Sequence, residues 1–121
     1  MDVKIEPLPD YLYVRMSGDY QDSTPIEGHP DSVGRACREG NYRRLLVDIK
    51  ELTGNMETLE AYHRGEDIAR VFSHGDVHIA IVGSREHIRV LAFFENVIVN
   101  RGAILRVFAD IDEATEWLTQ L

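Results

Sequence analysis

Leu45-Leu46-Val47-Asp48-Ile49 is a short apolar run that is interrupted by one acid. Such a run is typical of a strand that is buried on both faces, as the central strands of parallel sheets are. Two further runs share this character, Val77–Val82 and Ile104–Phe108. We therefore expect three buried strands at the centre of the fold.

Segments with helical spacing of apolar residues lie between and after these runs. Residues 56–72, 88–99 and 114–121 each carry apolar side chains at intervals of three or four. Strands that alternate with helices of this length predict crossover connections and a mostly parallel sheet. An α/β fold is therefore expected, with three successive strand and helix units.

The chain before these units has a different pattern. Apolar and polar residues alternate over residues 3–5 and 12–16, on either side of Pro7-Leu8-Pro9-Asp10. This pattern predicts an opening β-hairpin. Residues 18–30 are polar and broken by prolines and glycines, which predicts a long loop or an irregular helix start.

One more helix is expected after that loop. Asp31 or Ser32 could cap its start, and Gly40 could end it. No repeat, low-complexity tract or linker divides the chain, and 121 residues is an ordinary length for one core. Residues 1–121 are therefore expected to form a single domain.

Composition and charge narrow the possible partners. The chain is 44% hydrophobic and 28% charged, which supplies enough apolar side chain for a core. A formal net charge of −8 repels polyanions, so we expect no nucleic-acid partner. A membrane span needs about 18 consecutive apolar residues, and no run comes near that length, so an integral membrane protein is not expected.

The expected location is the cytoplasm. The segment Met1–Glu6 lacks the basic and apolar stretches of a secretory signal. Cys37 is the one cysteine, so an intrachain disulfide is impossible, and a single thiol suits a reducing compartment.

Two segments carry a resemblance to a known family. They are Leu46-Val47-Asp48-Ile49, leading through Leu52 to Thr53-Gly54, and Arg106–Asp110, followed by Glu113-Ala114 and Glu116-Trp117-Leu118. With the order of elements, they resemble the STAS family of sulphate transporter and anti-sigma-factor antagonist domains. The second segment looks like the end of small bacterial STAS-like proteins, which are also likened to lipid-binding CRAL-TRIO domains.

The resemblance implies a mixed sheet of four or five strands with about four helices chiefly on one face. It also implies roles in protein interaction or ligand sensing without catalysis. In anti-sigma antagonists a hydroxyl residue after the third strand is phosphorylated, and the corresponding run here is Met56-Glu57-Thr58-Leu59. Glu57 takes the acceptor position, and Thr58 offers the one hydroxyl, so a phosphorylation switch is not expected. Glu57 either mimics the modified state or is simply a favourable first-turn residue.

The carboxyl ends of the parallel strands are the expected place for a ligand. Two loops should meet there, Thr53-Gly54-Asn55 and Gly83-Ser84-Arg85. Small residues let backbone N–H groups approach an anion, and Arg85 adds a bidentate donor. The same residues also suit ordinary turns and helix caps, and neither loop matches a glycine-rich phosphate motif.

Metal and catalytic chemistry find little support in the sequence. The histidines show no convincing ligand spacing, so no metal site or other cofactor is expected. Ser84 and His87 could pair as nucleophile and base, but no orienting acid accompanies them and Ser-x-x-His at a helix start is usually a cap. We therefore expect no catalytic residues.

The segment from Ile88 to Val99 is the clearest indication of an interaction. It carries more apolar side chains than one sheet face can bury, and such a surplus generally marks a contact surface. Val90, Phe93, Phe94 and Val97 are the candidate interface residues. The alternative is a helix that is buried more deeply than usual.

These observations lead to two functional hypotheses. The first is a non-enzymatic cytoplasmic STAS-like module that binds a protein partner and forms a homodimer. The second is a carrier or sensor of a small lipid-like or anionic ligand, with Phe93 and Phe94 lining a pocket and Arg85 binding a charged head group.

Overall fold

The computed structural model describes residues 1–21, 28–54, 58–73 and 76–120, apart from the side chains of Thr58, Leu59 and Ala61. Five strands form one sheet in the order β1-β2-β3-β4-β5, in which β1 and β2 are antiparallel and the other neighbours are parallel. The strands are β1 (Asp2–Pro7), β2 (Leu12–Asp19), β3 (Arg44–Thr53), β4 (His78–Val82) and β5 (Ile104–Phe108). The expected mixed α/β sheet with an opening hairpin is confirmed.

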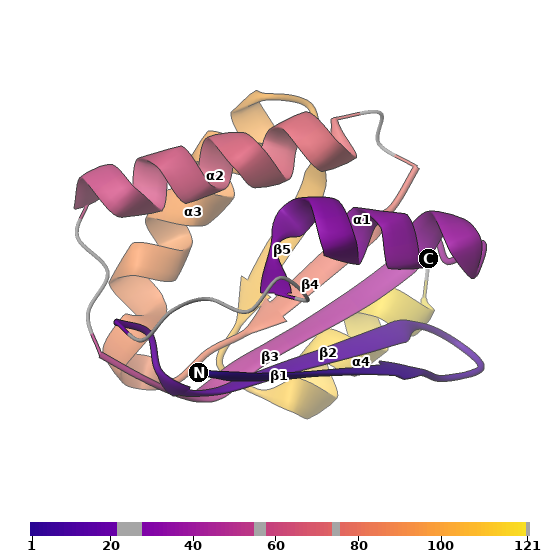
Figure 1. Cartoon of the computed structure of the whole chain (residues 1–121), viewed down its shortest axis with the longest axis horizontal. Helices are drawn as coiled ribbons and strands as arrows, with labels where there is room; N and C mark the ends of the chain where they lie inside the picture. The colour runs from indigo at the N-terminus through magenta and orange to yellow at the C-terminus, as the bar shows by residue number, and fades with distance from the viewer. Residues whose placement is uncertain (22–27, 55–57, 74–75, 121) are drawn as a thin grey trace.

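Helices lie on both faces of this sheet, three on one side and one on the other (Figure 1). They are α1 (Pro30–Glu39), α2 (Thr58–Phe72), α3 (Ile88–Asn100) and α4 (Ile111–Thr119), and a short 3₁₀ turn η2 (Arg85–His87) leads into α3. Helices α1, α2 and α3 cover one face, and α4 packs under β3, β4 and β5 on the other. In the described ranges no helix is both long enough and apolar enough to cross a membrane.

Strand β3 connects the two layers of the core. Successive side chains of a strand point to opposite faces, so Leu45 faces the three-helix layer and Leu46 faces α4. Both leucines are almost completely buried. Ile79 and Ala80 repeat this division on the neighbouring strand β4. The two-sided burial expected for these strands is therefore present.

The start of α1 differs from the expectation in one detail. The helix begins at Pro30 with His29 as the preceding cap residue, and no side chain caps it. Proline suits a first helical position because its ring already holds a helical φ and its missing N–H needs no partner there. Asp31 consequently lies inside the first turn, so the prediction of a cap at Asp31 or Ser32 is wrong. Gly40 ends the helix as expected.

Asp48, the acid within the apolar run of residues 45–49, accepts hydrogen bonds from two donors. Asp48 is 8% exposed, and its Oδ2 accepts a hydrogen bond of 2.8 Å from the Tyr13 hydroxyl. Its Oδ1 accepts a bond of 3.1 Å from the backbone N–H of Lys50. Burial, the bond to Asp48 and the charge of that carboxylate together raise the pKa of Tyr13 to about 12.

Removal of this hydroxyl should destabilise the protein. Tyr13→Phe leaves a buried carboxylate oxygen without its donor, so we expect a loss of about 1 to 3 kcal/mol in the free energy of unfolding. Urea denaturation followed by circular dichroism measures it. Tyr11→Phe is the matched control, because no hydrogen bond of the Tyr11 hydroxyl is recorded among the described residues. Equal losses in both variants would contradict the role of the Tyr13 bond.

The same bond predicts a dependence of stability on alkaline pH. The pKa of Tyr13 is raised from 10.0 to about 12 in the folded state. The folded state therefore favours the protonated phenol. The contribution of this preference to the free energy of unfolding is complete below pH 10.0 and is lost as the pH rises to about 12. Stability of the wild type should fall more steeply over this interval than stability of Tyr13→Phe.

Candidate functional site

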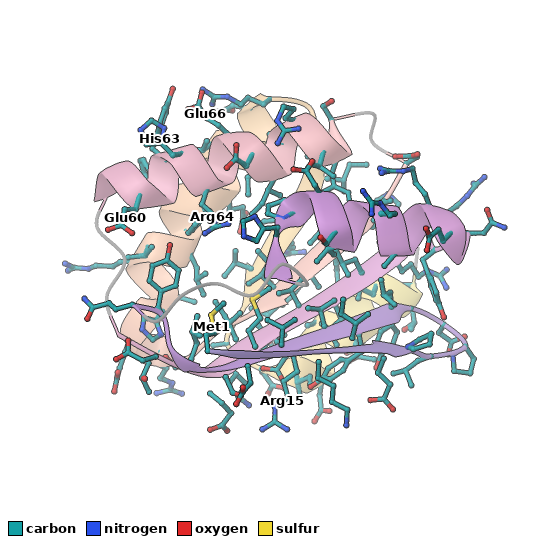
Figure 2. The ribbon with its side chains drawn as sticks, in the orientation of Figure 1. Met1, Arg15, Glu60, His63, Arg64 and Glu66 are labelled. Atoms are coloured by element: carbon teal, nitrogen blue, oxygen red, sulfur yellow. The ribbon has the colours of Figure 1, made fainter. Side chains whose placement is uncertain are left out.

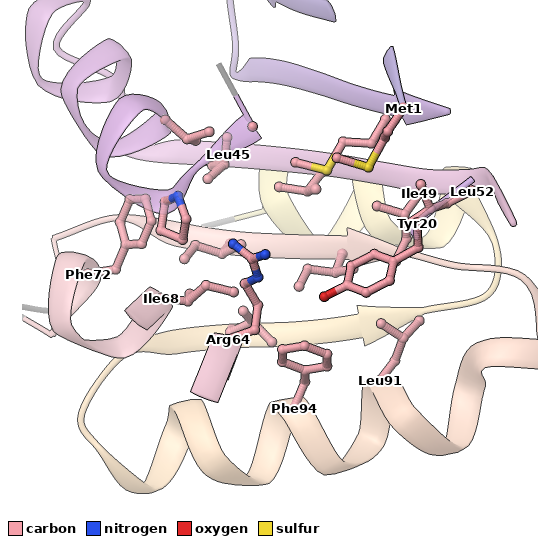
Figure 3. A pocket seen from close by; sticks show the side chains of 18 residues that line it. Met1, Tyr20, Leu45, Ile49, Leu52, Arg64, Ile68, Phe72, Leu91 and Phe94 are labelled. Atoms are coloured by element: carbon pink, nitrogen blue, oxygen red, sulfur yellow. The ribbon is translucent and has the colours of Figure 1, made fainter. Parts of the chain in front are cut away.

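An apolar cavity of about 130 Å³ lies between the sheet and the three-helix layer (Figure 3). Alternate residues of β3 form part of its wall, because Leu45, Val47 and Ile49 all point to the same face. Ile79 and Ile81 continue that wall on β4. The helices close the cavity with six apolar side chains: Pro30, Val33, Ile68, Phe72, Leu91 and Phe94.

Two polar groups face this apolar space. Figure 3 shows the guanidinium of Arg64, from α2, and the hydroxyl of Tyr20, which follows β2, directed into the cavity. Arg64 is half-buried. Within the described ranges, it makes no hydrogen bond or ion pair. A cation beside an apolar wall, with no counter-ion among the described residues, is an unusual arrangement, since partly buried charges are normally paired.

Other cations of the helix layer do have partners. Arg70 lies 3.3 Å from a carboxylate oxygen of Asp31, and Arg101 lies 3.5 Å from Glu66. Arg101 also donates a hydrogen bond of 2.8 Å to the Tyr62 hydroxyl. The side chains of the two ion pairs are exposed to solvent, whereas Arg64 points toward the sheet (Figure 2). The orientation of Arg64 is thus distinct from that of its neighbours.

The two loops predicted at the carboxyl ends of the strands do meet. His87 Nε2 lies 3.2 Å from the carbonyl oxygen of Gly54, and His87 Nδ1 lies 2.8 Å from Ser84 Oγ. Because a carbonyl only accepts, the neutral ring carries its proton on Nε2, and its Nδ1 then accepts from the Ser84 hydroxyl. Thr53 donates a hydrogen bond of 3.1 Å to the carbonyl of Gly18. His87 therefore links the end of β3 to the start of η2.

The Ser84 and His87 side chains are both used in this linkage. The second nitrogen of His87 faces a backbone carbonyl, not the orienting carboxylate of a triad. Among the residues that the structure describes, no group of three or more His, Cys, Asp or Glu side chains could hold a metal ion. Arg85 is exposed and does not form part of the cavity wall.

Part of the predicted site lies outside the described residues. Asn55 and Glu57 belong to the range 55–57, and Thr58 is described only as the first residue of α2. The proposed roles of Glu57 and Thr58 therefore stay predictions from the resemblance.

The candidate interface residues of α3 are largely turned inward. Phe94 and Val97 are 4% and 8% exposed, and Val90 and Phe93 are half-buried against the core. Phe94 lines the cavity as predicted for the ligand hypothesis, but Phe93 does not. The large apolar side chains that α3 leaves exposed are Ile88 and Val99, at 38% and 46%.

The sequence analysis missed Arg64 and Tyr20. A signal for Arg64 was present, because it precedes Ile68 by four residues and Phe72 by eight, which places it on the buried face of the helix. Tyr20 lay in a segment without a clear pattern and carried no such signal.

Comparison with protein-family models finds no match for the chain, and comparison with curated proteins finds none either.

The loop at Gly54 offers a test of this geometry. Its φ of +95° is strained for other residues, and an added Cβ lies 2.7 Å from Asp19 Oδ1. Gly102 has a similar φ of +96°, but there an added Cβ comes no closer than 3.4 Å to another atom. We expect Gly102→Ala to lose about 1 to 2 kcal/mol through backbone strain alone.

Gly54→Ala should lose at least as much as Gly102→Ala, since the same strain is joined by a contact with Asp19 Oδ1, which accepts a hydrogen bond from the backbone N–H of Gln21. Thermal unfolding followed by circular dichroism measures both. A smaller loss at Gly54 than at Gly102 would show that the close approach of β3 to the end of β2 is incorrect.

Proposed function

We propose that the protein binds a small amphiphilic molecule in the apolar cavity, as a carrier or sensor without catalysis. The cavity itself is the observation that carries this proposal. Its volume is about 130 Å³, and its walls are almost entirely apolar. An engineered apolar cavity of about 150 Å³ stays dry and binds benzene. An apolar group of about six to eight carbon atoms is therefore a fitting occupant.

The apolar surplus of α3 supports this proposal over a purely surface role. Leu91 and Phe94 face the cavity, and Ile98 is fully buried in the same core. Much of the surplus is thus used inside the chain, in the wall around the cavity. The resemblance to STAS-like and CRAL-TRIO domains is compatible with ligand sensing, and it adds the proposal that the bound state regulates a partner.

A second candidate is self-association through the outer side of α3. The exposed side chains of Ile88 and Val99 favour it. Light scattering of the wild type and of Val99→Asp tests this candidate, since Val99 is exposed and its replacement leaves the core intact. A dimer that becomes a folded monomer supports self-association, and a monomeric wild type excludes it.

A cavity-filling variant tests the principal proposal. Val47 is half-buried and lines the cavity, so Val47→Phe should occupy part of the space. We expect 1-octanol to shift the NMR signals of methyl groups of Ile79 and Leu91 in the wild type. The methyl groups of Leu118, on the opposite face of the sheet, should not move.

Val47→Phe should weaken the binding of 1-octanol at least tenfold, because the phenyl ring and the ligand compete for the space inside the cavity. Val99→Phe is the matched control, since it makes the same change on the exposed side of α3. Amide NMR spectra confirm that both variants are folded. The absence of any shift at Ile79 and Leu91 at millimolar octanol in the wild type would overturn the proposed function.

A further inference from the structure

We infer that the ligand is a medium-chain monocarboxylate whose carboxylate is bound by Arg64 while its apolar chain occupies the cavity. This inference rests on the proposed function and adds the chemical class of the ligand. The observation behind it is the position of one guanidinium at the wall of an otherwise apolar space (Figure 3).

Arg64 is the one charged side chain among the described residues of that wall. The described residues of the wall include no carboxylate, so none of them supplies a counter-ion inside the cavity. Glu60 is exposed, and His63 lies 3.5 Å from Glu66, away from the cavity (Figure 2). These groups of α2 leave the Arg64 guanidinium available to a bound anion.

The chemistry of the guanidinium selects an oxyanion. Its planar fork of N–H donors matches the two oxygens of a carboxylate, and such charge-assisted bonds are stronger than neutral ones. Bonds of this kind also gain strength where the surroundings exclude water. The hydroxyl of Tyr20 faces the same space and can donate a further hydrogen bond.

Charge balance favours a carboxylate over a phosphate. Arg64 carries one positive charge, and a carboxylate carries one negative charge. A phosphate monoester carries about −1.5 to −2 at neutral pH, which exceeds what one arginine can neutralise. The remaining charge would face a protein whose formal net charge is −8. A monoanion is therefore the better match.

The size of the cavity limits the chain. About 130 Å³ accommodates an apolar group comparable to benzene, with the carboxylate at Arg64. A saturated chain of about six to eight carbons, or one aromatic ring, meets this limit. Octanoate is therefore a suitable probe, and 1-octanol is the matched neutral compound with the same chain.

The test compares octanoate and 1-octanol on the full chain by NMR titration of the Ile79 and Leu91 methyl groups. The wild type should bind octanoate at least tenfold more tightly than 1-octanol. Arg64→Met keeps an unbranched side chain but removes the charge, so it should lose at least tenfold in octanoate affinity and bind 1-octanol as tightly as the wild type. Arg64→Lys, which keeps the charge without the fork, should lose less than Arg64→Met.

Arg89→Met is the control, because Arg89 is an exposed arginine on α3. It should bind both probes as the wild type does. The side-chain Nε–H signal of Arg64 should shift with octanoate and not with 1-octanol, which places the carboxylate directly at this group.

The outcomes separate the two proposals. If 1-octanol binds in the cavity but octanoate binds no more tightly, or if Arg64→Met retains the preference for octanoate, the proposed function stands and the role of Arg64 is wrong. If neither probe shifts the cavity methyl groups, both proposals are overturned.

Discussion

Burial of β3 on both faces is the constraint on which the rest of this structure depends. Leu45 and Leu46 are consecutive and point to opposite sides, so one strand joins the three-helix layer to the layer formed by α4. Asp48 in the same strand is tolerated because Tyr13 and the backbone of Lys50 donate to its carboxylate. A strand buried in this way needs a layer on each side. The crossover helices α1, α2 and α3 provide one layer, and α4, which follows β5, provides the other.

Close approach between helices shapes the space above the sheet. An added Cβ at Gly65 lies 3.1 Å from Val97 Cγ1, and one at Gly34 lies 2.4 Å from Val71 Cγ1. These two glycines therefore let α2 pack tightly against α3 and α1. The helices meet one another closely, while the cavity remains between their layer and the sheet. Arg64 stands on the inner side of α2, which places one guanidinium at the wall of this apolar space.

Much of the fold follows from local patterns. The continuous apolar runs predicted β3, β4 and β5, because a strand buried on both faces needs apolar residues at successive positions. The alternation on either side of Pro7 and Pro9 predicted the hairpin, because a strand buried on one face needs them at every second position. The predicted start of α1 at Asp31 or Ser32 was wrong because the helix begins at Pro30, whose ring already holds a helical φ, without a capping side chain. The meeting of the two loops was predicted from parallel topology alone, and His87 is the residue that joins them.

The mixed sheet, the helices between its strands and the apolar surplus of the segment from Ile88 to Val99 were predictable from the sequence, since each depends on the spacing of neighbouring residues. The packing of distant elements sets where that surplus is buried and which polar groups lie beside it. Phe94 faces a cavity whose other walls come from strands and helices distant in the chain, and Arg64 meets that space because α2 turns this face toward the sheet. A cavity is the space left between packed elements, so it exists only when all of them are in place.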